Sequence, residues 1–346
     1  MDIAIAGAGI LGHVIAWQLH QQGHKLTIYE ADSEGKNSGA AWTAAGMLTP
    51  STELHAPDDV LAMGLRSLQR WPVLIASLED KVAFNRGGCW VVSHREDKGS
   101  YQHFLNHLEQ NKRVDSATVH HCDRSDLMRQ QPALSERFTQ ALHLSKECWI
   151  NPVEVMDSIK RQLVTAGVNW FMNTPVSACL PHKIVTAETE VAGFDWVIDS
   201  RGLGAIDDWD GLRGIRGEVL VLHAPEVDIT ALVRLIHPRY SLYIVPRPDH
   251  VYIVGATEIE SDDRGPMSVR SALELLSAAY SIHSGFAEAR IVALRTNCRP
   301  TLPDHRPAVI VPEEGLIRAN GLYRHGILLA PEVAHRVIKK ITSYLP

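Results

Sequence analysis

The feature that most constrains the fold of this chain is a β-α-β pattern near its N-terminus. The short apolar segment from Asp2 to Ala6 predicts a buried strand. After a glycine-rich turn, His13 to Gln22 predicts a helix that ends at Gly23, and Lys25 to Tyr29 predicts a second strand. The pattern occupies about 30 residues, the size that a β-α-β unit requires. The chain therefore begins as a doubly wound nucleotide-binding fold would.

The turn carries three glycines, and an acidic residue closes the second strand. Gly7 permits a tight turn, Gly9 lets the backbone approach a pyrophosphate, and Gly12 lets the helix pack on the strand. Glu30 is placed to accept hydrogen bonds from ribose hydroxyls and would repel a 2′-phosphate, which disfavours NADP. A turn used only for packing would leave Glu30 unexplained. The candidate dinucleotide site also includes Ile10, Leu11 and Ala31. The motif alone does not separate FAD from NAD.

Composition excludes several classes of protein. The net charge of -6 argues against nucleic-acid binding, which favours a basic face. The five cysteines are odd in number and scattered, so neither a disulfide framework nor a structural zinc site is expected. No stretch approaches the roughly 18 apolar residues of a membrane span. The sequence predicts a soluble, cytoplasmic protein.

The rest of the chain alternates helical and strand-like segments. Asp58 to Leu78 has helical periodicity, although Pro72 is expected to kink or end the helix. Strand-like hairpins occupy the middle of the chain, and a strand at Leu316 to Ala319 with a helix to Ile341 is suited to return to the first sheet. We therefore expect an α/β fold, in which a discontinuous Rossmann-like domain carries an inserted α+β substrate domain with a mixed or antiparallel sheet.

Several further segments together resemble one family. They are Ser38 to Leu48, which is rich in small residues; Asp195 to Ala205; Leu242 to Arg247 with Gly255 to Thr257; Asn297 to Asp304; and Gly321 to Pro331. In this order they resemble the D-amino-acid oxidase superfamily, and most closely the glycine oxidases of thiamine biosynthesis. The resemblance covers essentially the whole chain. Taken alone, the small-residue segment could also be an ordinary flexible loop.

The resemblance implies a non-covalently bound FAD. It implies an FAD-binding domain at residues 1–80, 150–212 and 290–346, and a substrate-binding domain at 81–149 and 213–289. Beyond the glycine turn, the cofactor-binding residues that it implies are Ala44, Ala45, Gly46, Met47, Val176, Gly202, Arg299, Arg324, His325, Gly326, Ile327 and Leu328.

The same resemblance implies a substrate site. Arg299 matches the arginine that binds the substrate carboxylate, and a planar guanidinium can pair with both carboxylate oxygens. Tyr243 matches a tyrosine that reaches the same carboxylate, and Arg324 matches an arginine beside the flavin, although it could be a solvated surface arginine. Glu258 stands where the comparison has an apolar residue. It either enters the pocket, favouring a cationic or longer basic amine, or points outward as a solvated charge.

The implied activity is oxidation of glycine or another small amine, with hydride transfer from the α-carbon to flavin and oxygen as the acceptor. A homo-oligomer is also implied. A dehydrogenase with another acceptor and a flavoprotein assembly factor remain alternatives. We expect no metal site, because the histidine pairs lack a third ligand. Cys298 lies near the segment where some relatives attach flavin covalently, but its register favours a buried thiol.

Overall fold

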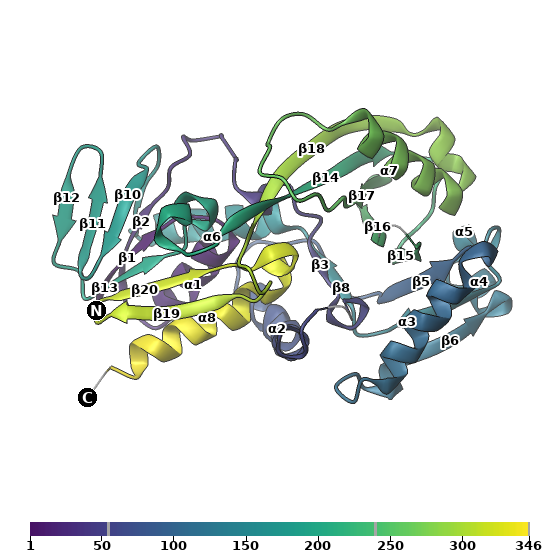
Figure 1. Ribbon diagram of the computed structural model, residues 1–346, viewed down its shortest axis with the longest axis horizontal. Helices are drawn as coiled ribbons and strands as arrows, with labels where there is room; N and C mark the ends of the chain where they lie inside the picture. The colour runs from purple at the N-terminus through teal and green to yellow at the C-terminus, as the bar shows by residue number, and fades with distance from the viewer. Residues whose placement is uncertain (54–55, 239–240, 345–346) are drawn as a thin grey trace.

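The computed structural model of the chain describes residues 1–53, 56–238 and 241–344. A six-stranded sheet occupies the left part of Figure 1, and an eight-stranded sheet occupies the upper and right part. In spatial order the six-stranded sheet contains β19 (Ala308–Glu313), β20 (Leu316–Asn320), β13 (Trp196–Asp199), β1 (Asp2–Ala6), β2 (Lys25–Tyr29) and β9 (Asn169–Phe171). Its strands are parallel except β19, which is antiparallel to β20.

The β-α-β unit predicted from the sequence is present. β1 and β2 are parallel neighbours, and α1 (Ile10–Gln21) connects them. The helix begins three residues earlier than predicted, directly after Gly9, so its first turn adjoins the glycine turn. Val14, Ile15 and Leu19 are fully buried against the sheet. The glycine turn therefore lies at the carboxyl end of β1, where doubly wound sheets bind nucleotides.

Three more helices complete the core around the six-stranded sheet: α2 (Asp58–Ala76), α6 (Pro152–Thr165) and α8 (Gly326–Thr342). Pro72 was expected to kink or end the first of these, and ending it is wrong, because α2 continues through Pro72 to Ala76. A proline removes one hydrogen bond of the helix, and packing on either side retains the rest. Trp71 is fully buried and donates from Nε1 to the Ile327 carbonyl oxygen at 3.1 Å.

The eight-stranded sheet contains β18 (Arg290–Thr301), β14 (Arg213–His223), β17 (Val251–Gly255), β16 (Ser241–Arg247), β15 (Leu232–Ile236), β5 (Cys89–Ser93), β7 (Gln140–Leu144) and β6 (Val119–Asp123). It is mixed, because β15 and β5 are parallel and the other neighbours antiparallel. The remaining α-helices are α3 (Lys98–Gln110), α4 (Arg124–Gln130), α5 (Pro132–Ser135) and α7 (Val269–Ile282). Buried apolar residues pack in two clusters that share its strands.

Two small sheets complete the fold. One contains β10 (Val176–Leu180), β11 (Lys183–Thr186) and β12 (Glu190–Ala192), and the other contains β3 (Met47–Leu48), β8 (Cys148–Ile150) and β4 (Phe84–Asn85). The strands of the six-stranded sheet come from three separate parts of the chain, and the fold is mixed α/β as expected. The expected domain boundary at residue 290 falls at the start of β18, which pairs with β14 in the eight-stranded sheet, and the domain limits stay a prediction. No helix in the described ranges is long and apolar enough to cross a membrane.

Candidate active site

A cavity of about 910 Å³ brings together residues from the β-α-β unit and from the eight-stranded sheet. One part of its lining, here called the glycine-turn region, consists of Gly7 to Leu11, Glu30 and Ala31. Another part, here called the arginine region, consists of Glu53, Tyr243, Glu258, Arg299 and Arg324. Segments more than 300 residues apart, such as those of Gly7 and Arg324, therefore share one site.

In the glycine-turn region, Gly9 differs from its two companions. A Cβ on Gly7 would lie 2.7 Å from the Arg201 Cα, and a Cβ on Gly12 would lie 2.0 Å from the Gly7 carbonyl oxygen. A Cβ on Gly9 would meet nothing within 4 Å, and Gly9 lines the cavity. Gly7 and Gly12 thus serve packing within the chain, whereas Gly9 leaves room for a group in the cavity. A pyrophosphate that approaches the backbone needs this space.

Glu30 lies at the carboxyl end of β2 and is held by backbone amides. The Ala8 N–H donates to its Oε2 at 2.6 Å, and the Asp32 N–H donates to its Oε1 at 3.0 Å. Each carboxylate oxygen can accept more than one hydrogen bond, so capacity for ribose hydroxyls remains. The geometry and donor set fit an unphosphorylated ribose of a dinucleotide.

The small-residue segment also borders the cavity. Ala44, Ala45 and Met47 line it, and Gly46 does not. Gly46 has φ +78°, and a Cβ on it would lie 2.0 Å from the Ile150 carbonyl oxygen. This glycine therefore lets the segment pack closely on β8, while its neighbours present small side chains and backbone to the cavity.

Arg299 is the cation of the arginine region that has no acidic partner at ion-pair distance among the described residues. Its Nη2 donates to the Thr257 carbonyl oxygen at 3.0 Å, and its Nη1 donates to the Arg216 carbonyl oxygen at 3.4 Å. Burial lowers the pKa of the guanidinium below its ordinary value, while the charge of Glu258 acts in the opposite direction. A carboxylate bound here would satisfy a charge that the protein leaves unmatched.

Arg324 has the opposite environment, because two carboxylates bracket it. Its Nη2 lies 2.5 Å from Glu53 Oε2, and its Nη1 lies 3.0 Å from Glu258 Oε2. Burial raises the pKa of Glu53, but Arg324 and neighbouring cations outweigh it and lower that pKa to about 2. Burial likewise raises the pKa of Glu258, but a hydrogen bond from Tyr323 and the charge of Arg324 lower it overall. Both carboxylates are therefore ionised at neutral pH.

Tyr243 joins this cluster to a buried carboxyl group. Its hydroxyl lies 2.9 Å from Glu53 Oε1 and 3.0 Å from the Thr52 hydroxyl. The Ser51 and Thr52 amides donate to Glu147 Oε1 at 2.7 and 3.2 Å. Burial raises the pKa of Glu147 to about 8. Glu147 therefore holds the turn η2 (Pro50–Thr52), which immediately precedes Glu53.

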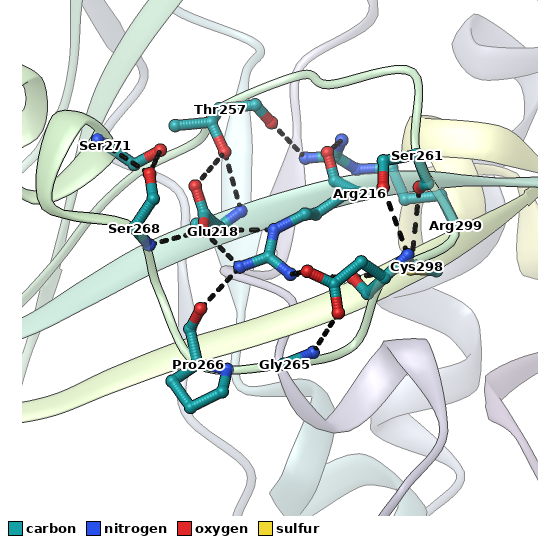
Figure 2. A network of polar contacts seen from close by, with 11 residues as sticks. Arg216, Glu218, Thr257, Ser261, Gly265, Pro266, Ser268, Ser271, Cys298 and Arg299 are labelled. Carbon is teal, nitrogen blue, oxygen red and sulfur yellow. Dashed lines mark hydrogen bonds and ion pairs between the residues drawn. The ribbon is translucent and has the colours of Figure 1, made fainter.

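A second polar network fixes the loop after β17 that carries Glu258, and Figure 2 shows it. The Arg216 guanidinium, which is almost fully buried, donates to Glu218 Oε1 at 2.6 Å and to the Pro266 carbonyl oxygen at 2.7 Å. The Thr257 hydroxyl donates to Glu218 Oε2 at 3.1 Å. Glu258, the next residue, is thereby tied to β14 through its neighbour.

Most of the predicted site residues line the cavity, including Val176, Gly202, Gly326 and Ile327. Gly12, Gly46, His325 and Leu328 do not. Leu328 lies in the core around the six-stranded sheet. His325 is buried beside the cluster, in a smaller cavity of about 300 Å³, and burial lowers its pKa to about 4.

Glu258 enters the pocket lining, although 47% of its side chain is exposed. Sequence reasoning missed Glu53, Arg216 and Glu147. Glu53 follows the small-residue segment, but no motif spacing marks it.

The remaining sequence predictions concern metals and Cys298. Within the described residues, no group of three or more His, Cys, Asp or Glu side chains could hold a metal ion. The Cys298 thiol is buried and lies 3.5 Å from the Asp263 carbonyl oxygen and 3.8 Å from that of Ser261. The thiol therefore contacts the loop after β17, and a non-covalent cofactor stays a prediction.

Comparison with known proteins agrees with these features. Residues 2–339 match the family described as FAD dependent oxidoreductase. The chain is 35% identical over 345 residues to a putative thiamine biosynthesis oxidoreductase of Rhizobium etli, covering 99% of this chain and 97% of that protein. It is 25% identical to a glycine oxidase of Geobacillus kaustophilus, covering 99% and 94% of the two chains.

Solved structures share the fold. Iminodiacetate oxidase from Chelativorans superposes with a TM-score of 0.85 at 24% identity, covering 99% of this chain and 97% of that one. Glycine oxidase from Geobacillus kaustophilus superposes with a TM-score of 0.83 at 24% identity, covering 100% and 95%. The family match spans nearly the whole chain, and the glycine-turn region fits its cofactor. The chain belongs to the family of FAD-dependent oxidoreductases, and its cofactor is FAD.

Proposed function

We propose that the chain oxidises glycine or another small amino acid or secondary amine at its α-carbon. Arg299 carries this proposal, because it is a cation in the cofactor cavity that donates hydrogen bonds to two neutral carbonyl oxygens. A guanidinium in this setting favours a ligand with a carboxylate. The names of the relatives, a glycine oxidase and a putative thiamine biosynthesis oxidoreductase, support the same class of substrate.

FAD would be held by the glycine turn, Glu30 and the small-residue segment, and when bound it supplies the hydride acceptor. The chain's own residues would bind and orient the amine. Arg299 would hold the substrate carboxylate and thereby fix the position of the α-carbon. The Tyr243 hydroxyl contacts Glu53 and Thr52, so we propose that its main role is to position Glu53. Any contact of Tyr243 with the substrate carboxylate would be secondary to that of Arg299.

Among the described residues of the arginine region, neither carboxylate is poised as a general base near neutral pH. The pKa of Glu53 is about 2, and that of Glu258 is lowered. We therefore propose that the amine reacts in its neutral form, and that reduction quickens as pH rises toward the pKa of the substrate amine. Gly326 and Ile327, at the start of α8, line the cavity, where the positive end of the helix favours developing negative charge.

In this reaction the neutral amine loses a hydride from the α-carbon and becomes a protonated imine, which then releases one proton from nitrogen to the solvent. Molecular oxygen would then take up the two electrons with protons, giving hydrogen peroxide. The similarity to the putative thiamine biosynthesis oxidoreductase supports a use of the imine in that pathway.

The test is an anaerobic screen of the FAD-bound protein with glycine, sarcosine and D-alanine, recorded as loss of visible flavin absorbance. We expect at least one to bleach the flavin, and air to restore the colour with release of peroxide. Bleaching that only a dye acceptor reverses would identify a dehydrogenase. Failure of all three amines, in a protein that dithionite still reduces, would refute the proposal and favour an assembly factor.

A further inference from the structure

The arginine region contains a charge arrangement that the proposed reaction does not use. Two guanidinium groups and two carboxylates lie in this region, and both carboxylates form ion pairs with Arg324. Glu53 already gives Arg324 an acidic partner at 2.5 Å. Glu258 is therefore a second acidic partner of an arginine that already has one.

Glu258 places a carboxylate in the lining of the cavity that contains Arg299. It lines the main cavity together with Arg299, and it also lines the smaller cavity of about 300 Å³. Tyr323 and Arg324 line both cavities as well. These three side chains therefore border both cavities, and the charge of Glu258 acts on Arg299.

The position of Glu258 is fixed on two sides. Its Oε2 lies 3.0 Å from Arg324 Nη1, and the Tyr323 hydroxyl also donates to it. The preceding residue is Thr257, whose hydroxyl donates to Glu218 (Figure 2). The Thr257 carbonyl oxygen accepts a hydrogen bond from Arg299 Nη2. The loop therefore keeps this negative charge near the carboxylate-binding arginine.

We propose that Glu258 selects monocarboxylate amines and rejects those with a second carboxylate. It does so by occupying Arg324 Nη1 and by placing a fixed negative charge in the wall of the cavity that contains Arg299. A like charge in a partly desolvated site opposes binding, and the occupied guanidinium offers no compensating partner. This inference rests on the proposed function, because it assumes that Arg299 binds the substrate carboxylate.

The test compares two ligands that are not oxidised, acetate and malonate, in the FAD-bound protein at low ionic strength. Dissociation constants are measured from the change in the visible flavin spectrum. Glu258→Gln keeps the size of the side chain and removes its charge. Glu260→Gln is the matched control, because Glu260 is an exposed residue of the same loop that pairs with Arg213 and does not line the cavity.

We expect Glu258→Gln to strengthen malonate binding relative to acetate on the order of tenfold, and Glu260→Gln to leave that ratio unchanged. An unchanged ratio in Glu258→Gln, an equal change in Glu260→Gln, or no binding of either ligand to the unsubstituted protein would overturn the proposal.

Turnover of sarcosine and iminodiacetate separates the two proposals. If sarcosine reduces the flavin but Glu258→Gln does not raise the relative rate with iminodiacetate, the selectivity proposal fails and the proposed function stands. If the malonate ratio shifts as expected but no amine reduces the flavin, the proposed function fails and the anion selectivity stands.

Discussion

The two regions of the cavity are built in contrasting ways. The glycine-turn region comes from the first 31 residues and is made largely of backbone, with Gly9 leaving space and amides fixing Glu30. The arginine region gathers charged side chains from separate loops and strands, between Glu53 and Arg324. The first region can recognise a cofactor by shape, whereas the second depends on a balance of charge that single substitutions can shift.

The largest effect is expected from Arg299→Ala, which removes the unmatched cation of the arginine region. We expect kcat/KM for glycine to fall about 1000-fold, or about 4 kcal/mol, because a charge-assisted carboxylate contact is lost. The FAD content of this variant and of its control is measured as well, because the resemblance also implies that Arg299 contacts the cofactor. Arg306→Ala is the control, because Arg306 is half-exposed and pairs with Asp59. Similar losses in both variants would show that the effect is not specific to the site.

A smaller effect, confined to the glycine-turn region, separates Gly9 from Gly12. In Gly12→Ala the new Cβ would meet the Gly7 carbonyl oxygen, so we expect the apoprotein to lose about 3 kcal/mol of stability. In Gly9→Ala the Cβ meets no protein atom, so the apoprotein should unfold as the original does. Its affinity for FAD should nevertheless fall about 100-fold. Calorimetry of the apoproteins and FAD titration measure the two effects, and equal destabilisation by both substitutions would contradict this distinction.

The smallest effect concerns Glu147, behind the arginine region. Its folded pKa of about 8 lies above the ordinary value, so the folded state binds the extra proton between about pH 4.5 and 8. This group therefore makes the free energy of unfolding decrease as pH rises through that window. Relative to the original protein, Glu147→Gln should gain on the order of 2 kcal/mol between pH 5 and 8. Urea unfolding at both pH values tests this, and a difference that does not vary with pH would contradict it.

The sequence allowed prediction of the elements whose determinants are local. The spacing of Gly7, Gly9, Gly12 and Glu30 follows one β-α-β unit, so pattern and structure agree there. The continuation of α2 through Pro72 could not be predicted from the sequence, because the burial of Trp71 and its contact with α8 come from tertiary packing.

The arginine region shows the same limit more strongly. The family resemblance pointed to Arg299, Tyr243 and Arg324, and all three line the cavity. Nothing in the sequence indicated that Glu53 and Glu258 pair with Arg324. Along the chain Glu53 lies 271 residues from Arg324, and Glu258 lies 66 residues from it. Spacing along the chain does not encode contacts between loops that only the completed fold brings together.

The central claim is that one cavity places the carboxylate of an amine at Arg299, beside FAD. Anaerobic flavin reduction by glycine and by methylamine, which lacks the carboxylate, tests it most directly, with both measured in the unsubstituted protein and in Arg299→Ala. We expect rapid bleaching only by glycine in the unsubstituted protein, and equally slow bleaching by both amines in Arg299→Ala. Equal reduction by both amines in the unsubstituted protein, or undiminished reduction by glycine in Arg299→Ala, would contradict the claim.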